Sequence, residues 1–342
     1  MNIAFAYNVK KSKPSIKFEE QTDLEFDLPS VIDGIEKSFV ELGHVVYRVE
    51  ADENSFFKLK ELKGKVDIVF NIAEGLWGDA RESQIPLFCE VLQIPYTHSS
   101  PSTHAITLDK QFTKWILDGA NLVSVPNSQT ISSKNYKVDK TLKFPLIVKP
   151  NKEGSGKGIV SENVVRNLAD LTKRIRIISE NFKKEVIVEE FVDGREFTVG
   201  VIGNNGDFKV LPIIEQKFGL LPPGMNKIAG YELKWIYEYK MKSVSDVYDC
   251  PAKISKKLEE EIKTTAKELC RVLDVRDAAR IDYRLNDKGD LYFLEINTLP
   301  GINPDPNETS CYPLAARTAG MDFKEMIRQI LASACKRYGL KS

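Results

Sequence analysis

The sequence predicts an α/β protein whose N-terminal part contains a parallel sheet. Residues 2–7, 45–49 and 66–70 are short, mainly apolar segments of the kind that form buried strands. Between the first two, apolar residues recur at helical spacing over residues 30–42, and Gly43 can end that helix. A strand–helix–strand order predicts parallel strands with helices packed on the faces of their sheet. At 342 residues, the chain is long enough for about two or three domains.

Composition and charge are those of a soluble globular protein. Hydrophobic residues make up 42% and charged residues 29%, which is typical of a sizeable core. Lysine plus arginine and aspartate plus glutamate both number 49, so the charge balance argues against nucleic acid or a membrane surface as the partner. No signal peptide is expected, and no apolar run approaches the roughly 18 residues that span a bilayer. The five cysteines are scattered without a CxxC pair, which predicts a reduced, cytoplasmic protein without zinc.

A glycine-containing segment, residues 71–82, follows the third predicted strand. Ligands of parallel sheets collect beyond the carboxyl ends of the strands, where this segment is expected to lie. Gly75 and Gly78 permit the backbone to approach a ligand closely, and Glu74 stands beside the first of them. The alternative interpretation is a connecting loop without a functional role.

The middle of the chain brings lysines to a flexible loop. The character of the sequence changes after about residue 100, and a helix over residues 102–117 is expected to carry Lys110. A later strand ends at Lys149, and the glycine-rich residues 153–158 follow it. Successive backbone N–H groups in such a loop can bind an anion. The spacing differs from the GxxxxGK[ST] phosphate loop, and an ordinary surface turn is the alternative interpretation.

Two further strands, residues 186–192 and 196–202, flank a polar kink. Such a kink offers backbone hydrogen-bonding groups to the edge of a nucleotide base, and Glu196 is placed to accept hydrogen bonds from ribose hydroxyls. The alternative is a hairpin with a solvated carboxylate. Residues 212–251 follow with little pattern, and so long an irregular stretch predicts a mobile functional loop or lid.

The most informative segment consists of two strands joined by the polar turn 286–289. Asp282 precedes the turn, whereas Glu295 and Asn297 follow it and share one face of their strand. Two carboxylates and an amide oxygen form an oxygen-only cluster that suits Mg²⁺ carrying the phosphates of a nucleotide. Arg280 shares the face of Asp282, where a fixed cation can hold a developing oxyanion. An ordinary hairpin with a solvated polar face is the alternative.

Together these motifs resemble the ATP-grasp fold and, more closely and over nearly the whole chain, the D-alanine–D-alanine ligases. The resemblance rests on the segments Ile94-Pro-Tyr-Thr, Leu108-Asp-Lys110, Ile147-Val-Lys-Pro150, Glu153-Gly-Ser155, Glu196-Phe-Thr-Val, Arg280-Ile-Asp282, Leu294-Glu-Ile-Asn-Thr298 and Pro300-Gly301. It implies three domains: a Rossmann-like pre-ATP-grasp domain at 1–100, a central ATP-grasp subdomain at 101–188, and a C-terminal subdomain with the metal site at 189–342. The nucleotide would lie between the second and the third.

The resemblance also implies a role for each site residue. Lys110 and Lys149 would bind the phosphates of ATP beneath the loop that contains Glu153, Gly154, Ser155 and Gly156. The adenine would lie against Glu189, Glu190 and Val192, and the ribose against Glu196. Two Mg²⁺ ions, with Mn²⁺ as an alternative metal, would be held by Asp282, Glu295 and Asn297. Arg280 and the Gly301 N–H would be the oxyanion donors.

The first-substrate side departs from the pattern of these ligases. Their His-Gly pair after the third strand is replaced here by Glu74-Gly75. Residues 8–14 do not match their N-terminal glycine-rich segment. With these departures, the first substrate need not be D-alanine, and Glu74 is placed to recognise an ammonium group.

The lid and the second-substrate side are closer to the pattern. Counted back from Cys250, the Lys-Tyr pair of the ligases' lid corresponds to Lys240-Met241, whereas the serine of the glycine-rich loop, Ser155, is retained. The resemblance assigns Lys240 and Ser310, with the arginine already named, to the second substrate.

The predicted function is an ATP-dependent carboxylate–amine ligase that forms an amide bond through an acyl phosphate. Its partners would be a small carboxylate and an amino acid, and the resemblance is compatible with a homodimer. One alternative is a kinase with the same fold, which would stop after phosphorylating a small molecule. The other is a non-catalytic nucleotide-binding protein, against which the intact metal-binding and oxyanion residues argue.

Overall fold

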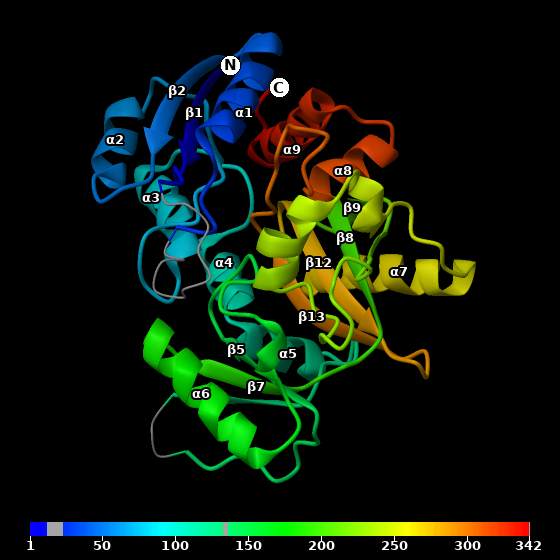
Figure 1. The fold of residues 1–342 in the computed structure, drawn as a ribbon. Helices are drawn as coiled ribbons and strands as arrows, with labels where there is room; N and C mark the ends of the chain where they lie inside the picture. Colours follow the sequence, from blue (N-terminus) through cyan, green and yellow to red (C-terminus); the bar gives the residue numbers. More distant parts are fainter. Residues whose placement is uncertain (12–22, 133–135, 342) are drawn as a thin grey trace.

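The computed structural model describes residues 1–11, 23–132 and 136–341. Three sheets, one after another along the chain, form the framework, and helices cover their faces (Figure 1). Of the segment 8–14 that fails to match the ligases, residues 12–14 lie outside the described residues.

The first sheet is parallel, as the sequence predicts. Its order is β2-β1-β3, formed by Val45–Glu50, Asn2–Tyr7 and Ile68–Asn71. The flanking helices are α1 (Pro29–Glu41), α2 (Ser55–Leu62) and α3 (Gln84–Leu92). The aromatic rings of Phe5, Phe39 and Phe70 meet edge to face between α1 and the sheet, which explains why that helix covers this face.

One helix was expected over residues 102–117, but the structure has two, α4 (Pro101–Leu108) and α5 (Lys110–Gly119). The break falls at Asp109, whose backbone is extended and whose carboxylate accepts hydrogen bonds from Gln111 N and Phe112 N. A short side chain that caps the second helix competes with continuation of the first. Lys110 is thereby fixed in the first turn of α5.

The second sheet is antiparallel, with the order β4-β7-β5-β6. Its strands are Ser128–Ile131, Val186–Glu190, Leu146–Pro150 and Val164–Val165. Helix α6 (Leu168–Phe182) buries Leu171, Ile175 and Ile178 against the apolar face of this sheet. Because β7 continues to Glu190, the expected domain boundary at residue 188 lies inside a strand of this sheet.

The third sheet has the order β11-β10-β8-β12-β13, with β9 paired to β8. Its strands are β8 (Arg195–Asn204), β9 (Asp207–Val210), β10 (Ile214–Gln216), β11 (Tyr248–Asp249), β12 (Asp277–Leu285) and β13 (Leu291–Asn297). Helix α7 (Lys256–Val272) packs on one face, while α8 (Cys311–Thr318) and α9 (Phe323–Tyr338) pack on the other. Helix α9 also lies beside α1, so the last helix joins the first and third sheets (Figure 1).

Residues 212–251, expected to be irregular, contain several short elements. Strands β10 and β11 pair with each other and extend the third sheet. A π-helix over Leu233–Tyr237 and 3-10 turns at Glu238–Lys240 and Val244–Asp246 lie between them. We call residues 231–250 the lid segment.

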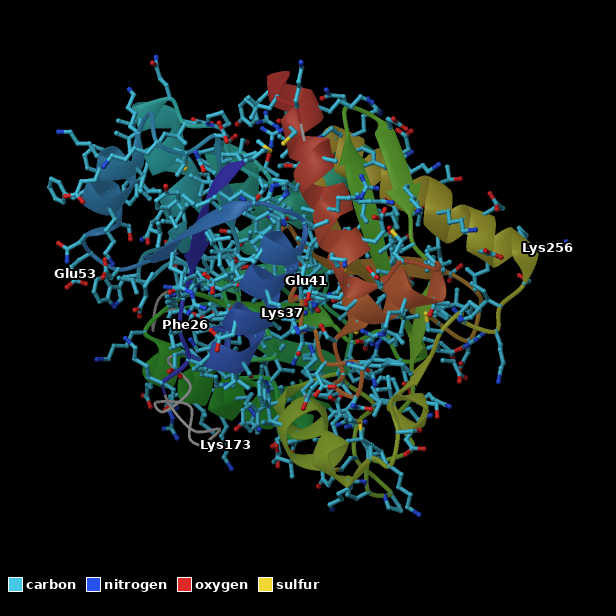
Figure 2. All side chains as sticks on the ribbon, turned by 90° about the horizontal axis from the view of Figure 1, so that it is seen from above. Phe26, Lys37, Glu41, Glu53, Lys173 and Lys256 are labelled. Atoms are coloured by element: carbon cyan, nitrogen blue, oxygen red, sulfur yellow. The ribbon has the colours of Figure 1, made fainter. Side chains whose placement is uncertain are left out.

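Charged side chains occupy the outer surface of the molecule. Figure 2 shows Lys37 and Glu41 on the exposed side of α1, with Glu53 and Lys256 at the periphery. Among the described residues, no helix is long and apolar enough to cross a membrane.

Candidate active site

Apolar and charged side chains alternate along strand β12, so the two kinds lie on opposite faces of the sheet. Ala279, Ile281 and Tyr283 are buried in the core beneath α7. The intervening residues, Arg280 and Asp282, therefore belong to the opposite face of the strand. Their neighbours across the antiparallel ladder come from β8 and β13, which complete the site.

The hairpin brings the predicted carboxylates and the arginine together. Asp282 lies opposite Glu295 in the register, and Arg280 lies opposite Asn297. Arg280 Nη2 donates to Asp282 Oδ2 at 3.0 Å and lies 3.7 Å from Glu295 Oε1. Thr198 Oγ1 on β8 donates to Asp282 Oδ1 at 2.8 Å. The sequence had not singled out this threonine, because its role depends on pairing between distant strands.

The two carboxylates have opposite ionisation tendencies. Burial raises the pKa of Asp282, and the charge of Arg280 only partly offsets that effect. Burial also disfavours the charge of Glu295, but Lys110 and Arg280 outweigh it and lower the pKa of Glu295 to about 2. Lys110 Nζ lies 3.3 Å from Glu295 Oε2. Glu295 is therefore kept ionised beside Lys110 and Arg280.

Asp282, Glu295 and Asn297 provide hard oxygen donors that fit Mg²⁺. Among the described residues, no group of three or more His, Cys, Asp or Glu side chains is arranged to hold a metal. Two carboxylates and one amide do not make a complete cage for a metal ion. This donor set fits a metal that also takes oxygen ligands from a bound phosphate.

A buried cluster of lysines lies next to these carboxylates. Lys149 and Lys114 both donate to the carboxylate of Glu189, one to each oxygen. Lys110 Nζ donates to the carbonyl oxygen of Glu153 at 2.6 Å. The sequence prediction missed Lys114, although it lies one helical turn after Lys110 on α5 and so shares its face.

The carboxylate and the lysines of this cluster remain ionised despite their burial. Burial opposes ionisation of Glu189, but Lys114 and Lys149 outweigh it and lower the pKa of Glu189 to about 2. Burial lowers the pKa of Lys114 to about 8, although Glu189 acts in the opposite direction. Two cations on one carboxylate leave an excess positive charge, which suits an anionic ligand.

The glycine-rich loop has backbone conformations that its sequence permits. Ser155, Gly156 and Gly158 all have positive φ, at 52°, 73° and 72°. The Gly154 N–H donates to Glu25 Oε1 at 2.7 Å, so one backbone donor already binds a carboxylate. The loop is thus able to bind anionic oxygens, as its composition predicted.

Arg81 connects this loop to the N-terminal part of the chain. Its Nη2 donates to both oxygens of Glu25 at 3.0 and 2.8 Å, and its Nη1 donates to Lys152 O at 2.8 Å. The same guanidinium lies 3.6 Å from Glu153 Oε2. Burial opposes ionisation of Glu153, but Arg81 and neighbouring lysines lower the pKa of that carboxyl to about 2.

A cavity of about 80 Å³ lies between the second and third sheets, beside the lysines and carboxylates. Its lining includes five residues that were assigned to the nucleotide, Lys149, Glu189, Glu190, Val192 and Glu196, and two that were assigned to the metal, Asp282 and Glu295. Lys110 and residues 153–156 do not line it. Its lining also includes Lys234 and Arg284, which the sequence did not single out. The carboxylate of Glu190 accepts from Asn127 Nδ2 and Lys143 N, so its side chain supports the neighbouring loops.

The lid segment presents Lys234, not Lys240, to this cavity. Lys234 lines the cavity with Asp282. Lys240 is exposed, and its Nζ lies 4.9 Å from the centre of the Tyr237 ring. The role of Lys240 therefore stays a prediction from the resemblance.

On the second-substrate side, Ser310 and Gly301 lie together. Ser310 Oγ donates to Gly301 O at 3.2 Å and accepts from Asn303 N at 3.2 Å. Gly301 is exposed, and no atom lies within 4 Å of the position that a Cβ would take. Open space therefore remains beside the backbone that was predicted to stabilise an oxyanion.

Glu74 and Gly75 follow β3, where the sequence predicted a ligand. Gly75 has φ +79°, and a Cβ there would lie 2.2 Å from Arg81 O, so only glycine fits. Glu74 forms no hydrogen bond or ion pair with the residues that the structure describes. Burial, followed by the charges of Glu82 and Glu25, raises the pKa of Glu74 well above its usual value. A bound ammonium group would relieve this repulsion.

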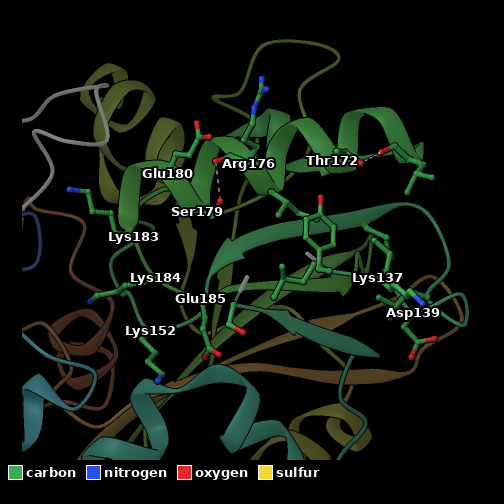
Figure 3. A pocket seen from close by; sticks show the side chains of 18 of the residues that line it. Lys137, Asp139, Lys152, Thr172, Arg176, Ser179, Glu180, Lys183, Lys184 and Glu185 are labelled. Atoms are coloured by element: carbon green, nitrogen blue, oxygen red, sulfur yellow. Dashed lines mark hydrogen bonds between the residues drawn. The ribbon is translucent and has the colours of Figure 1, made fainter. Parts of the chain in front are cut away.

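A second cavity, of about 1600 Å³, lies between α6 and the loop that precedes β5 (Figure 3). Thr172 and Arg176 of α6 border it on one side, and Lys137 and Asp139 border it on the other. None of the predicted site residues lines it. Lys149, Asp282 and Glu295 line the smaller cavity instead.

The family model for the D-alanine–D-alanine ligase C-terminus matches residues 120–332. A D-alanine–D-alanine ligase from Aquifex aeolicus is 32% identical over 298 residues, covering 87% of this chain and 92% of that protein. The uncharacterized protein y4sG of Sinorhizobium fredii is 32% identical over 314 residues, covering 90% of this chain and 88% of that protein.

A solved structure shares the fold of this chain. The crystal structure of a Bacillus anthracis D-alanine–D-alanine ligase complexed with ATP superposes with a TM-score of 0.73 at 20% identity, covering 100% of this chain and 99% of that chain. The likeness confirms the predicted fold class. These comparisons give no support to the kinase or the non-catalytic alternative. The chain belongs to the D-alanine–D-alanine ligase family of ATP-dependent ligases and has the ATP-grasp fold.

Proposed function

We propose that this protein joins a carboxylate to the amine of an amino acid at the expense of ATP. The observation that carries the proposal is the convergence of Lys149 and the Asp282–Glu295 pair on one cavity, with Arg280 hydrogen-bonded to Asp282. Cations, metal-binding oxygens and an oxyanion donor are what phosphoryl transfer followed by acyl transfer requires.

In the first step, an oxygen of the donor carboxylate attacks the γ-phosphorus of ATP, and the bond to the β-phosphate oxygen breaks. Lys110 and Lys149 are assigned to the phosphates, beneath the loop that contains Ser155. Mg²⁺ held by Asp282, Glu295 and Asn297 would offset the charge on the phosphates. The products of this step are an acyl phosphate and ADP.

In the second step, the amine nitrogen of the acceptor attacks the acyl carbon. A tetrahedral oxyanion forms, and Arg280 and the Gly301 N–H are assigned as its donors. The bond between that carbon and the phosphate oxygen then breaks, and the amine loses a proton. We assign Ser310 and Lys240 to the acceptor side, as the resemblance implies, whereas Lys234 lines the nucleotide cavity.

The two-step path is tested by following an oxygen atom from the donor carboxylate to inorganic phosphate. A donor labelled with ¹⁸O in its carboxylate should place one labelled oxygen in the inorganic phosphate, because the acyl carbon keeps the other. The phosphate is analysed by mass spectrometry after complete turnover. Amide formation with unlabelled phosphate would exclude an acyl phosphate.

The donor is proposed to carry an ammonium group that Glu74 binds, and to differ from D-alanine. Replacing Glu74 by Gln should raise KM for amine-bearing donors about tenfold or more, because a charge-assisted hydrogen bond is lost. Asp79→Asn, in the same loop but 69% exposed, is the matched control and should leave KM unchanged. Equal kinetics for wild type and Glu74→Gln with every amine-bearing donor would remove Glu74 from the site.

A further inference from the structure

We propose that Arg284 positions Glu196 for recognition of the nucleotide ribose. The inference rests on the proposed function only in placing the ribose of ATP beside these two residues, which line the same cavity. Arg284 would not contact the reacting atoms. It would fix the carboxylate that does contact the sugar.

The ladder between two strands places the pair face to face. Arg284 on β12 lies directly opposite Glu196 on β8 in the antiparallel register. Their side chains therefore stand on the same face of the sheet. Arg284 is 2% exposed and Glu196 is 8% exposed, so the contact is shielded from solvent.

The hydrogen bonds leave one carboxylate oxygen available. Arg284 Nε and Nη2 both donate to Glu196 Oε2, at 3.0 and 2.7 Å. Glu196 Oε1 accepts no hydrogen bond from the described residues. A carboxylate that is held at one oxygen and open at the other is suited to accept from a ligand hydroxyl in a fixed direction.

The guanidinium is itself held from several sides. Its Nη1 donates to Val192 O at 3.0 Å, and its Nη2 also donates to Lys227 O. The rings of Phe191 and Phe218 lie 5.3 and 5.6 Å from its central carbon. Arg284 thus connects the segment assigned to the adenine with the loop before the lid segment. The planar fork of arginine makes these contacts together, whereas a lysine ammonium cannot reproduce them.

The test compares ATP with 2′-deoxy-ATP and 3′-deoxy-ATP. Dissociation constants are measured by calorimetry with Mg²⁺, without any amino-acid substrate, for wild type, Glu196→Ala, Arg284→Met and Arg284→Lys. Wild type should bind at least one deoxynucleotide about tenfold more weakly than ATP, because a hydrogen bond to a charged group is lost. Glu196→Ala should bring that ratio close to one. Arg284→Met should also bring the ratio of deoxynucleotide to ATP dissociation constants close to one. Arg284→Lys should raise that ratio only slightly above the value for Arg284→Met.

Arg195→Met is the matched control. Arg195 is the neighbouring residue on β8 and forms a similar two-bond pair with Glu215, but its side chain is 43% exposed. This variant should keep the wild-type ratio. Equal weakening of all three nucleotides by Arg284→Met would show a merely structural role and overturn the proposal. A full wild-type ratio in the folded Arg284→Lys protein, or no discrimination in wild type, would overturn it as well.

The binding measurement also separates two kinds of failure. If wild type bound ATP and discriminated the deoxynucleotides without forming an amide, the ligase proposal would fail while the role of Arg284 stood. If it bound no ATP, both would fall.

Discussion

Glu189 holds two lysine ammonium groups in the interior of the molecule. Its side chain is 3% exposed, and those of Lys114 and Lys149 are 1% and 9% exposed. If one lysine turns to another anion, the second lysine still pairs with Glu189. The carboxylate is then not left buried without a cation. Lys149, which lines the cavity, is therefore available to a phosphate while Lys114 keeps Glu189 neutralised.

The carboxylates of the hairpin should be indispensable for turnover. Changing either Asp282 or Glu295 to alanine should slow turnover about a thousandfold, equivalent to roughly 4 kcal/mol, because metal-bound charge stabilisation is lost. Steady-state release of ADP measures the effect. Asp287→Ala, in the exposed turn between the same strands, should retain the wild-type rate. Near-normal rates in both site variants would refute the metal assignment.

At the scale of elements, local patterns explain which predictions held. The strands that carry Asp282 and Glu295 were predicted because alternation and a polar turn are features of neighbouring residues. Cross-strand partners could not be predicted, because Thr198 and Arg284 gain their roles only from the register of β8 with β12. The break at Asp109 was also missed, because helical spacing of apolar residues continues through it.

A carboxyl of the lid segment contacts the second-substrate side. Thr309 Oγ1, next to Ser310, donates to Glu238 Oε2 at 2.6 Å, while Oε1 of Glu238 is buried without a hydrogen bond from the described residues. Burial raises the pKa of Glu238 to about 7, although the Thr309 contact acts in the opposite direction. The lid segment therefore carries a carboxyl that is costly to ionise in the folded state.

This carboxyl predicts a pH-dependent stability. Because the folded pKa of Glu238 lies above its unfolded value near 4.3, stability should fall as pH rises from about 4 through 7 and then level off. Glu238→Gln should therefore be more stable than wild type by about 3 to 4 kcal/mol at pH 8 and nearly equal to it at pH 4. Denaturant unfolding at both pH values measures this. Glu261→Gln on α7 should show no such trend, and a pH-independent gain in Glu238→Gln would contradict the assignment.

At the scale of the whole molecule, the site is assembled from all three sheets. In the proposed site, the loop after β3 supplies Glu74 and Arg81, the second sheet supplies Lys149, and the third supplies the oxygens that we propose to bind the metal. We infer that the sheets define three domains close to 1–100, 101–188 and 189–342, with the second boundary moved beyond β7. Charged groups are buried where these domains meet, and their pairing favours one relative orientation of the domains.

Replacing Arg81 should weaken the contact between the N-terminal part of the chain and the glycine-rich loop. Its side chain is 6% exposed and Glu25 is 7% exposed, so Arg81→Met would leave a buried carboxylate without its cation. The free energy of unfolding should fall by about 3 kcal/mol. ATP affinity should fall as well, because the Glu25 carboxylate orders Gly154.

Arg48→Met provides the comparison for this change. Arg48 pairs with Glu36, but their side chains are 41% and 28% exposed, so its loss should cost less than about 1 kcal/mol. Urea unfolding of both variants measures the difference. Similar costs for the two arginines would mean that the contact between Arg81 and Glu25 does not hold the domains together.

The most direct test of ligase activity is a product screen. The protein is incubated with ATP, Mg²⁺ and D- and L-amino acids, singly and in pairs, and each mixture is analysed for ADP, phosphate and new amides by mass spectrometry. We expect ADP and phosphate in equal amounts with an amide product, and a donor other than D-alanine. Formation of ADP with a phosphorylated small molecule and no amide, across all mixtures that turn over ATP, would contradict the account.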